Sequence, residues 1–142
     1  MHKSQDKTVS AIIDKMMKKD LFSQWLGVER MDEGKGFCQL RMTVRGEMCN
    51  GFSIAHGGIA YSLADSALAF ASNSHGKHAV SMETSVSHLK PLKAGDTIMA
   101  IAEEISCTNR TGVYLVRIEK ENGELAAIFK GVVFRKENSW DV

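Results

Sequence analysis

The residues best suited to chemistry lie in one segment, which runs from Asn50 through His56, Gly57 and Gly58 to Asp65. Two glycines at the start of a predicted helix let backbone N–H groups approach a ligand, because no Cβ stands in the way. These N–H groups favour an anion, or a carbonyl oxygen that becomes an oxyanion. A glycine pair that serves only the tight packing of the helix against a strand remains a second interpretation.

Asp65 is the only charged residue between Gly57 and His75. A carboxylate with small and apolar neighbours either faces water on a narrow polar strip or is desolvated in a cleft, where burial perturbs it toward catalytic use. The pattern supports both placements equally. In either case Asp65 stands out as a candidate for a reacting side chain.

Helix geometry separates the two ends of this segment. Asp65 follows Gly57 by eight residues, which is about 12 Å along one helix axis at a rise of about 1.5 Å per residue. Reacting groups must lie within roughly 3 to 3.5 Å of each other, so the two residues of one chain cannot act on the same carbonyl. If both act together, two chains share each site, as in a twofold dimer with antiparallel helices side by side.

The residues before the helix allow several roles. His56 could orient Asn50, donate a hydrogen bond to a carbonyl oxygen, or only fix the loop. Asn50 precedes Gly51 in a common turn pair, so a structural role is open for Asn50 as well. Cys49 has no base placed beside it by a recognisable local signature, which argues against a cysteine nucleophile.

Basic residues in two predicted loops are candidates for contacts with the anionic part of a ligand. Arg110 and Thr111 lie between two predicted strands, and Lys90 and Lys93 lie near Pro91. Arginine and lysine in loops are usually only solvated, so both roles stay open. The chain has no Walker loop, GxGxxG, HExxH or calcium-loop pattern, and we expect no metal site.

Size and composition indicate one domain over residues 1–142. The formal charge of +1 gives no long-range reason to expect nucleic acid or an anionic membrane as a partner. No apolar run is long enough to span a bilayer, and residues 1–7 lack the apolar segment of a signal peptide, so we expect a cytoplasmic protein. Cys38, Cys49 and Cys107 are odd in number and far apart, which indicates neither a disulfide framework nor a zinc knuckle.

Hydrophobic periodicity predicts two helices and six strands. An apolar stripe indicates a surface helix over Ser4–Asp20, and the nearly uncharged stretch Gly57–His75 indicates a buried helix. Strands are expected over Val28–Met31, Gly36–Val44, Ala79–Leu89, Thr97–Cys107, Val113–Glu121 and Leu125–Arg135. Asp32–Gly34 is expected to turn between the first two strands. Asn122-Gly123 is expected to form a type I′ hairpin turn, in which both central residues need positive φ.

The order of these elements predicts an α+β fold. One antiparallel curved sheet wrapped around the long central helix satisfies it, because few connections require parallel pairing. The last four strands are expected to follow one another as a meander. No internal repeat or linker divides the chain.

These segments resemble those of a known family. Asn50–Gly58 and Ser62–Ala67 are similar to the signature of the PaaI-type hotdog thioesterases of phenylacetic acid degradation. The similarity continues through Leu89–Asp96 and Arg110–Tyr114, so it covers nearly the whole chain in order and spacing. Ser66 departs from the Thr of many relatives but keeps the hydroxyl. The resemblance implies the hotdog fold.

The resemblance also implies hydrolysis of an acyl-CoA thioester, with an aryl-acetyl or other medium-sized acyl group, to free acid and CoA. Asp65 would be the nucleophile or general base, and Gly57 N–H would polarise the carbonyl. Asn50 and His56 would place the attacking water or the carbonyl. Substrate-binding residues are expected to be Gly58, Ser66, Ser81, Lys90, Arg110 and Thr111. No cofactor is implied, since coenzyme A is part of the substrate, and family members act as homotetramers built from two hotdog dimers.

Two other functions stay open. A hotdog hydratase or dehydratase also binds acyl thioesters, and it pairs a catalytic histidine, here His56, with an acidic residue across the site. A non-catalytic acyl-CoA-binding protein would use the same pocket. Hotdog transcription regulators add a DNA-binding module to such a pocket, but the roughly twenty residues before Leu21 are too few for a helix-turn-helix unit and a linker.

Overall fold

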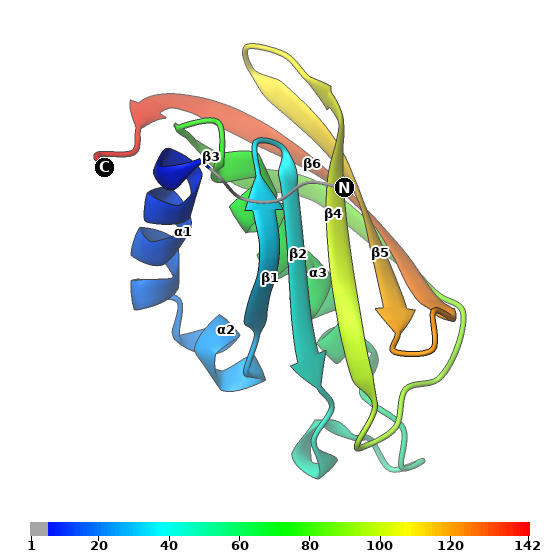
Figure 1. The fold of residues 1–142 in the computed structure, drawn as a ribbon. Coiled ribbons are helices and arrows are strands. Elements are labelled where there is room, and N and C mark those ends of the chain that lie inside the picture. The colour runs from blue at the N-terminus through cyan, green and yellow to red at the C-terminus, as the bar shows by residue number, and fades with distance from the viewer. Residues whose placement is uncertain (1–5) are drawn as a thin grey trace.

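A long buried helix, α3 (Gly57–Asn73), is enclosed by one curved six-stranded sheet (Figure 1). The structure is a computed structural model and describes residues 6–142. The strands are β1 (Glu29–Gly34), β2 (Phe37–Thr43), β3 (Lys77–His88), β4 (Thr97–Cys107), β5 (Thr111–Lys120) and β6 (Leu125–Ser139). A short 3₁₀ helix, Gly46–Met48, follows β2. The predicted α+β hotdog arrangement is confirmed.

The strands lie in the order β1-β2-β4-β5-β6-β3, and every neighbouring pair is antiparallel. The predicted four-strand meander is correct only for β4, β5 and β6. β3 instead pairs with β6, from Ala79 opposite Arg135 to His88 opposite Ala127. Its other side has no partner among the described strands. The order of strands along the chain does not decide which of them become neighbours, so this pairing could not be predicted from periodicity.

The core lies between α3 and the sheet. Leu63, Leu68 and Phe70 of α3 are at most 1 % exposed, as the lack of charge in this helix predicts. β6 approaches the helix closely at Gly131, where an added Cβ would lie 2.5 Å from Leu68 Cδ2. None of the described helices, α3 included, is long and apolar enough to cross a membrane.

The N-terminal helix is shorter than predicted and is followed by a second one. Within the predicted span Ser4–Asp20, the structure has α1 (Lys7–Lys19), whose N-cap is Asp6. Residues 4 and 5 lie outside the described part of the chain. The second helix, α2 (Leu21–Leu26), was not predicted, because six residues are too few to show a helical period.

Two turns differ from their predictions. β1 continues to Gly34, so its turn into β2 falls at Lys35-Gly36, where Gly36 has a φ of +71°. The predicted hairpin between β5 and β6 forms, but only Gly123 has positive φ and Asn122 does not. Gly123 N–H donates to the Lys120 carbonyl, so the turn closes one residue earlier than a type I′ turn centred on Asn122-Gly123. The predicted strand Thr97–Cys107 matches β4 at both ends, and the boundaries of the other strands differ from the predicted ones by at most four residues.

Candidate active site

Asn50 closes the loop that leads into α3. Its Oδ1 accepts hydrogen bonds from the N–H groups of Phe52 (2.9 Å) and Ile54 (3.4 Å), and its own N–H donates to the Ile54 carbonyl at 2.8 Å. Asn50 is half-buried, and its side-chain NH₂ has no hydrogen-bond partner within residues 6–142. The structural interpretation of Asn50 therefore holds, and its amide N–H donors remain available to a ligand.

His56 caps the start of α3. Its Nδ1 accepts a hydrogen bond from Gly58 N–H at 3.1 Å, so the neutral ring carries its proton on Nε2. This bond occupies the N–H of Gly58, which had been expected to bind substrate. Gly57 N–H, by contrast, has no hydrogen-bond partner in the described part of the chain. The helix start therefore offers one free backbone donor, at the glycine for which the sequence predicted that role.

A pocket of about 340 Å³ opens at this helix start. It brings together four of the predicted site residues, which are Asn50, His56, Gly57 and Lys90. His88, at the end of β3, also lines it and was missed by the sequence analysis. A Cβ added at Gly57 would lie 3.3 Å from His88 Nε2, so this imidazole packs closely against Gly57, whose N–H is free. No local motif indicates His88, because its place depends on the pairing of β3 with β6.

Asp65 does not line this pocket. It lies eight residues along α3 from Gly57, a separation of about 12 Å. Asp65 is half-buried, and burial raises the pKa of its carboxyl, to which the nearby Asp20 carboxylate adds. Between the two placements that the sequence left open, the structure favours the desolvated one.

A buried chain of hydrogen bonds lies next to Asp65. Ser66 is 7 % exposed, and its Oγ is 2.7 Å from Ser23 Oγ of α2. Ser23 Oγ donates in turn to Asp20 Oδ2 at 2.6 Å. The Ser66 hydroxyl is therefore engaged in a buried hydrogen bond within the chain, and Ser66 does not line the pocket at Gly57. Asp20 and Ser23 were not predicted as part of the site, because α2 itself was not predicted.

The other predicted binding residues are spread over the sheet. Ser81 is exposed on the open edge strand β3. Lys90 N–H donates to the carbonyl of Ala126, whereas the Arg110 carbonyl accepts from Arg135 N–H. Those two β6 residues are nine apart, or about 30 Å along a strand. Arg110, in the β4–β5 turn, and Thr111, the first residue of β5, therefore lie far from Lys90 along the sheet. Figure 1 shows this turn between β4 and β5.

Within one chain, the donors of the pocket and the Asp65 carboxylate lie apart. The pocket has three sources of donors for a carbonyl oxygen, which are Gly57 N–H, the Nε2–H of His56 and the side-chain NH₂ of Asn50. The carboxylate with the raised pKa lies elsewhere on the same helix. Such donors stabilise an oxyanion, but hydrolysis also requires a base or nucleophile within about 3 to 3.5 Å of the reacting carbon.

Comparison with known proteins agrees with the fold. Residues 52–127 match the thioesterase superfamily. The acyl-coenzyme A thioesterase PaaI of Escherichia coli is 37 % identical over 116 residues, which are 82 % of this chain and 83 % of that protein.

Two solved structures are similar as well. The structure of the E. coli PaaI protein superposes with a TM-score of 0.92 and 33 % identity over 96 % of this chain and 99 % of that one. The TT0310 protein of Thermus thermophilus gives a TM-score of 0.80 and 38 % identity over 83 % of this chain and 99 % of that one. The chain therefore belongs to the thioesterase superfamily, as a thioester hydrolase of the PaaI-type hotdog family.

Proposed function

We propose that this protein hydrolyses acyl-CoA thioesters to free acid and CoA, at sites that are each shared by two chains. The substrate class is supported by the relationship to the acyl-coenzyme A thioesterase PaaI. Membership of the thioesterase superfamily favours hydrolysis over the hydratase and the non-catalytic interpretations. The single observation that carries the shared site is the absence of Asp65 from the pocket at Gly57.

In the proposed reaction, Gly57 N–H of one chain binds the thioester carbonyl oxygen and stabilises the oxyanion that forms on it. Asp65 of the second chain either takes a proton from the attacking water or attacks the carbonyl carbon itself. The carbon–sulfur bond then breaks, and CoA leaves as the thiol after taking up a proton, from the protonated Asp65 in the first route and from solvent in the second. In the second route, water then hydrolyses the acyl anhydride on Asp65, which releases the free acid and restores the carboxylate. The free Nε2–H of His56 and the side-chain NH₂ of Asn50 orient the carbonyl or the water. No metal is needed for this step, because a thioester carbonyl is already electrophilic.

The open edge of the sheet supports pairing of two chains. Among the described strands, β3 pairs with β6 alone, and its edge exposes Val80 (46 %) and Met82 (62 %). A long edge strand with apolar side chains is a template for pairing with another chain. Two antiparallel β3 strands would join the sheets of two molecules and set their α3 helices antiparallel. A homotetramer would consist of two such dimers.

The proposal extends to the acyl group, the CoA phosphates and the location of the protein. The pocket of about 340 Å³ fits the expected aryl-acetyl or other medium-sized acyl group. Lys90 lines that pocket and is placed to contact a phosphate, whereas Arg110 and Thr111 reach a CoA phosphate only if another chain brings them close. A cytoplasmic location agrees with the three free cysteines, because thiols stay reduced there.

Complementation between inactive variants tests the shared site. Asp65→Asn removes the carboxylate, and Gly57→Val fills the pocket in front of the free N–H. In a mixed dimer, one site receives both wild-type halves and the other receives both altered halves. Random exchange of subunits should therefore restore about a quarter of the wild-type sites. CoA release from an acyl-CoA panel measures this, with each variant alone as the control.

Two results would contradict different parts of the proposal. If subunit exchange is confirmed and no activity returns, the site is not shared. If the wild type releases no CoA from any acyl-CoA but hydrates enoyl-CoA, the thioesterase function itself is wrong. Binding of acyl-CoA without release would favour the non-catalytic interpretation.

A further inference from the structure

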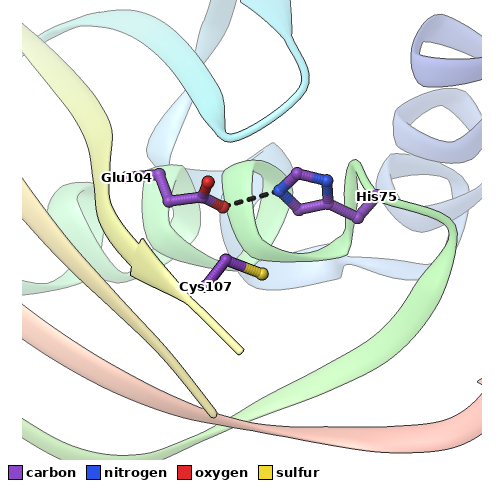
Figure 2. Close-up of side chains that lie close together, drawn as sticks. All are labelled: His75, Glu104 and Cys107. Carbon is purple, nitrogen blue, oxygen red and sulfur yellow. Dashed lines mark hydrogen bonds and ion pairs between the residues drawn. The ribbon is translucent and has the colours of Figure 1, made fainter. Parts of the chain in front are cut away.

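Three side chains with metal-binding donor atoms meet at the far end of α3 from the pocket. His75 follows the helix, and Glu104 and Cys107 project from β4 toward it (Figure 2). Their donor atoms all lie within 4.8 Å of one another, and His75 Nε2 is 2.6 Å from Glu104 Oε1. His75 is eighteen residues beyond Gly57, about 27 Å away by helix rise, so this cluster is separate from the proposed active site.

A β-bulge brings the two β4 residues to the same face. Residues three apart on a regular strand point to opposite faces. In β4 the register shifts between Glu104 and Ser106, so that Glu104 is opposite Tyr114 and Cys107 is opposite Gly112. Tyr114 is buried and Gly112 lies two residues before it, so both Glu104 and Cys107 face the inside of the sheet. Without this bulge, Cys107 would point away from His75.

Neighbouring groups hold Glu104 in place before any ligand binds. Its Oε1 accepts a hydrogen bond from the buried Tyr114 hydroxyl at 2.7 Å. The β1–β2 turn covers it closely, because a Cβ added at Gly36 would lie 3.0 Å from Glu104 Cβ. Such outer contacts orient metal ligands in known sites.

The end of α3 is anchored as firmly. Gly36 N–H donates to Ser74 Oγ at 2.7 Å, and Trp140 Nε1–H donates to Asn73 Oδ1 at 2.9 Å. The two residues before His75 are therefore tied to the β1–β2 turn and to the C-terminal segment. The histidine ring starts from a fixed backbone.

The cluster is open to an incoming ion, and the two cations near it are hydrogen-bonded to other groups. The side chains of His75 and Glu104 are 23 % and 26 % exposed. Two cations act on Cys107, Lys77 and Arg135, but each is engaged elsewhere. Lys77 Nζ donates to Asn109 Oδ1 at 3.2 Å, and Arg135 donates to the Thr108 carbonyl at 2.6 Å.

We propose that His75, Glu104 and Cys107 bind one Zn²⁺ ion, with a water molecule as fourth ligand. Imidazole nitrogen, carboxylate oxygen and thiolate sulfur are the ligands that zinc takes in proteins. With zinc bond lengths of about 2.0 to 2.3 Å, tetrahedral ligands lie about 3.4 to 3.6 Å apart. The three donor atoms need to move by only about 1 Å to reach this spacing. The Cys107 thiol releases its proton as the Zn–S bond forms, and the Nε2 proton that His75 shares with Glu104 leaves to solvent as Nε2 binds the ion.

This site departs from the sequence expectation of no metal. Zinc motifs are found in sequence by short spacings between ligands. Here the ligands come from a helix end and from the two sides of a bulge, and Cys107 is 32 residues beyond His75. An ion there would clamp the end of α3 to β4.

Titration with Zn²⁺ and Co²⁺ tests the site on tag-free, fully reduced protein. We expect one Co²⁺ per chain, with ligand-field bands in the visible range and a thiolate-to-cobalt charge-transfer band. Zn²⁺ should displace Co²⁺ and raise Tm. Cys107→Ser should abolish the charge-transfer band, and His75→Gln should weaken Zn²⁺ binding by at least about tenfold. Cys49→Ser, which alters a partly buried cysteine at the pocket end of the chain, serves as the matched control and should bind as the wild type does.

Circular dichroism of each variant separates loss of the site from loss of the fold. The proposal is overturned if the reduced wild type shows no charge-transfer band at saturating Co²⁺. It is also overturned if Cys107→Ser, still folded, keeps the band and the stoichiometry. Neither readout uses thioesterase activity, so the outcome is independent of the proposed function.

Discussion

Ser23 Oγ and Ser66 Oγ lie 2.7 Å apart in the core, and Ser23 Oγ also donates to Asp20 Oδ2 at 2.6 Å. These two hydrogen bonds join the start of α2 to Ser66, the residue that follows Asp65 on α3. The Asp20 carboxylate lies at the end of these hydrogen bonds. Burial is the largest cause of the raised pKa of Asp65, and the charge of Asp20 is the second cause. The junction between α1 and α2 therefore acts on the electrostatics of the proposed catalytic carboxylate.

Replacing Asp20 by Asn should shift the pH dependence of hydrolysis. Asp65 must be ionised to act, and removing the Asp20 charge lowers the pKa of Asp65. The acid limb of kcat/KM should move to lower pH. Asn keeps an oxygen that can accept from Ser23 N–H, so the cap of α2 survives. Asp14→Asn, an exposed change on α1, is the control. An unchanged acid limb in Asp20→Asn would show that the two carboxylates are not coupled.

Asp65→Asn should inactivate the enzyme and stabilise its fold. Loss of the base or nucleophile should cost about 100- to 10,000-fold in kcat. The folded-state pKa of Asp65 is raised, so the folded chain holds this proton more tightly than the unfolded chain does. Its contribution to stability is complete below the unfolded-state pKa and is lost as pH rises through the folded-state pKa. The variant should therefore have a higher Tm at neutral pH, and this gain should shrink on acidification.

Thermal unfolding of the wild type and Asp65→Asn across the acidic range measures this difference. Both proteins need the same buffer and ionic strength. A lower Tm for the variant at neutral pH, or a gain that does not change with pH, would mean that Asp65 is not held in an unfavourable environment.

The sequence predicted those parts of the site that depend on local patterns. Gly57 at the start of α3 and the loop closed by Asn50 follow from glycine, helix and turn rules, and both occur in the structure. His88 depends on the pairing of β3 with β6, which local patterns do not determine. Asp20 is placed near Asp65 by α2, and this six-residue helix is too short to show a helical period in the sequence.

The same reason explains the errors in the fold prediction. Alternation identified strands such as β4 and β5, because each of them has one buried face, but it did not identify their neighbours. β3 was therefore placed beside β4 instead of β6. The bulge at Glu104 was invisible for a related reason, since the extra residue is recognised only against the register of β5.

A double-mutant cycle on Ser23 and Ser66 should reveal coupling inside the core. Each Ser→Ala change should cost about 1 kcal/mol, because it removes a hydrogen bond between buried hydroxyls. Ser23→Ala with Ser66→Ala should cost less than the sum, since the second change no longer leaves a partner unsatisfied. Chemical denaturation of the four proteins measures the free energies of unfolding. Strict additivity would contradict a direct Ser23–Ser66 bond.

A charge on the open edge of the sheet should prevent assembly. Met82→Lys places an ammonium on β3, where a second chain is proposed to pair. The variant should elute as a monomer and lose thioesterase activity, because neither half of the site is complete alone. Met31→Lys places the same charge on β1, the other edge strand, and should change neither property. Light scattering coupled to size exclusion gives the mass. A monomeric variant with full activity would rule out the shared site.

Adding a methyl group at Gly57 tests whether the enzyme needs the close contact between Gly57, with its free N–H, and the His88 ring. A Cβ there lies 3.3 Å from His88 Nε2, tighter than an ordinary contact, so Gly57→Ala should displace one of the two. We expect kcat/KM to fall by up to about 100-fold. Gly51→Ala, where a Cβ meets nothing within 4 Å, is the matched control and should stay near wild type.

The double variant Gly57→Ala with His88→Ala separates the two causes of that loss. If the methyl group acts by pushing the imidazole, removing the imidazole should restore much of the activity that Gly57→Ala loses. If it acts by moving the N–H away from the carbonyl oxygen, the double variant should be no better than Gly57→Ala. His88→Ala alone supplies the baseline, because its own effect must be subtracted. Rescue would show that the contact with His88 is what requires glycine at residue 57. No rescue would show that the activity is lost because the backbone N–H has moved.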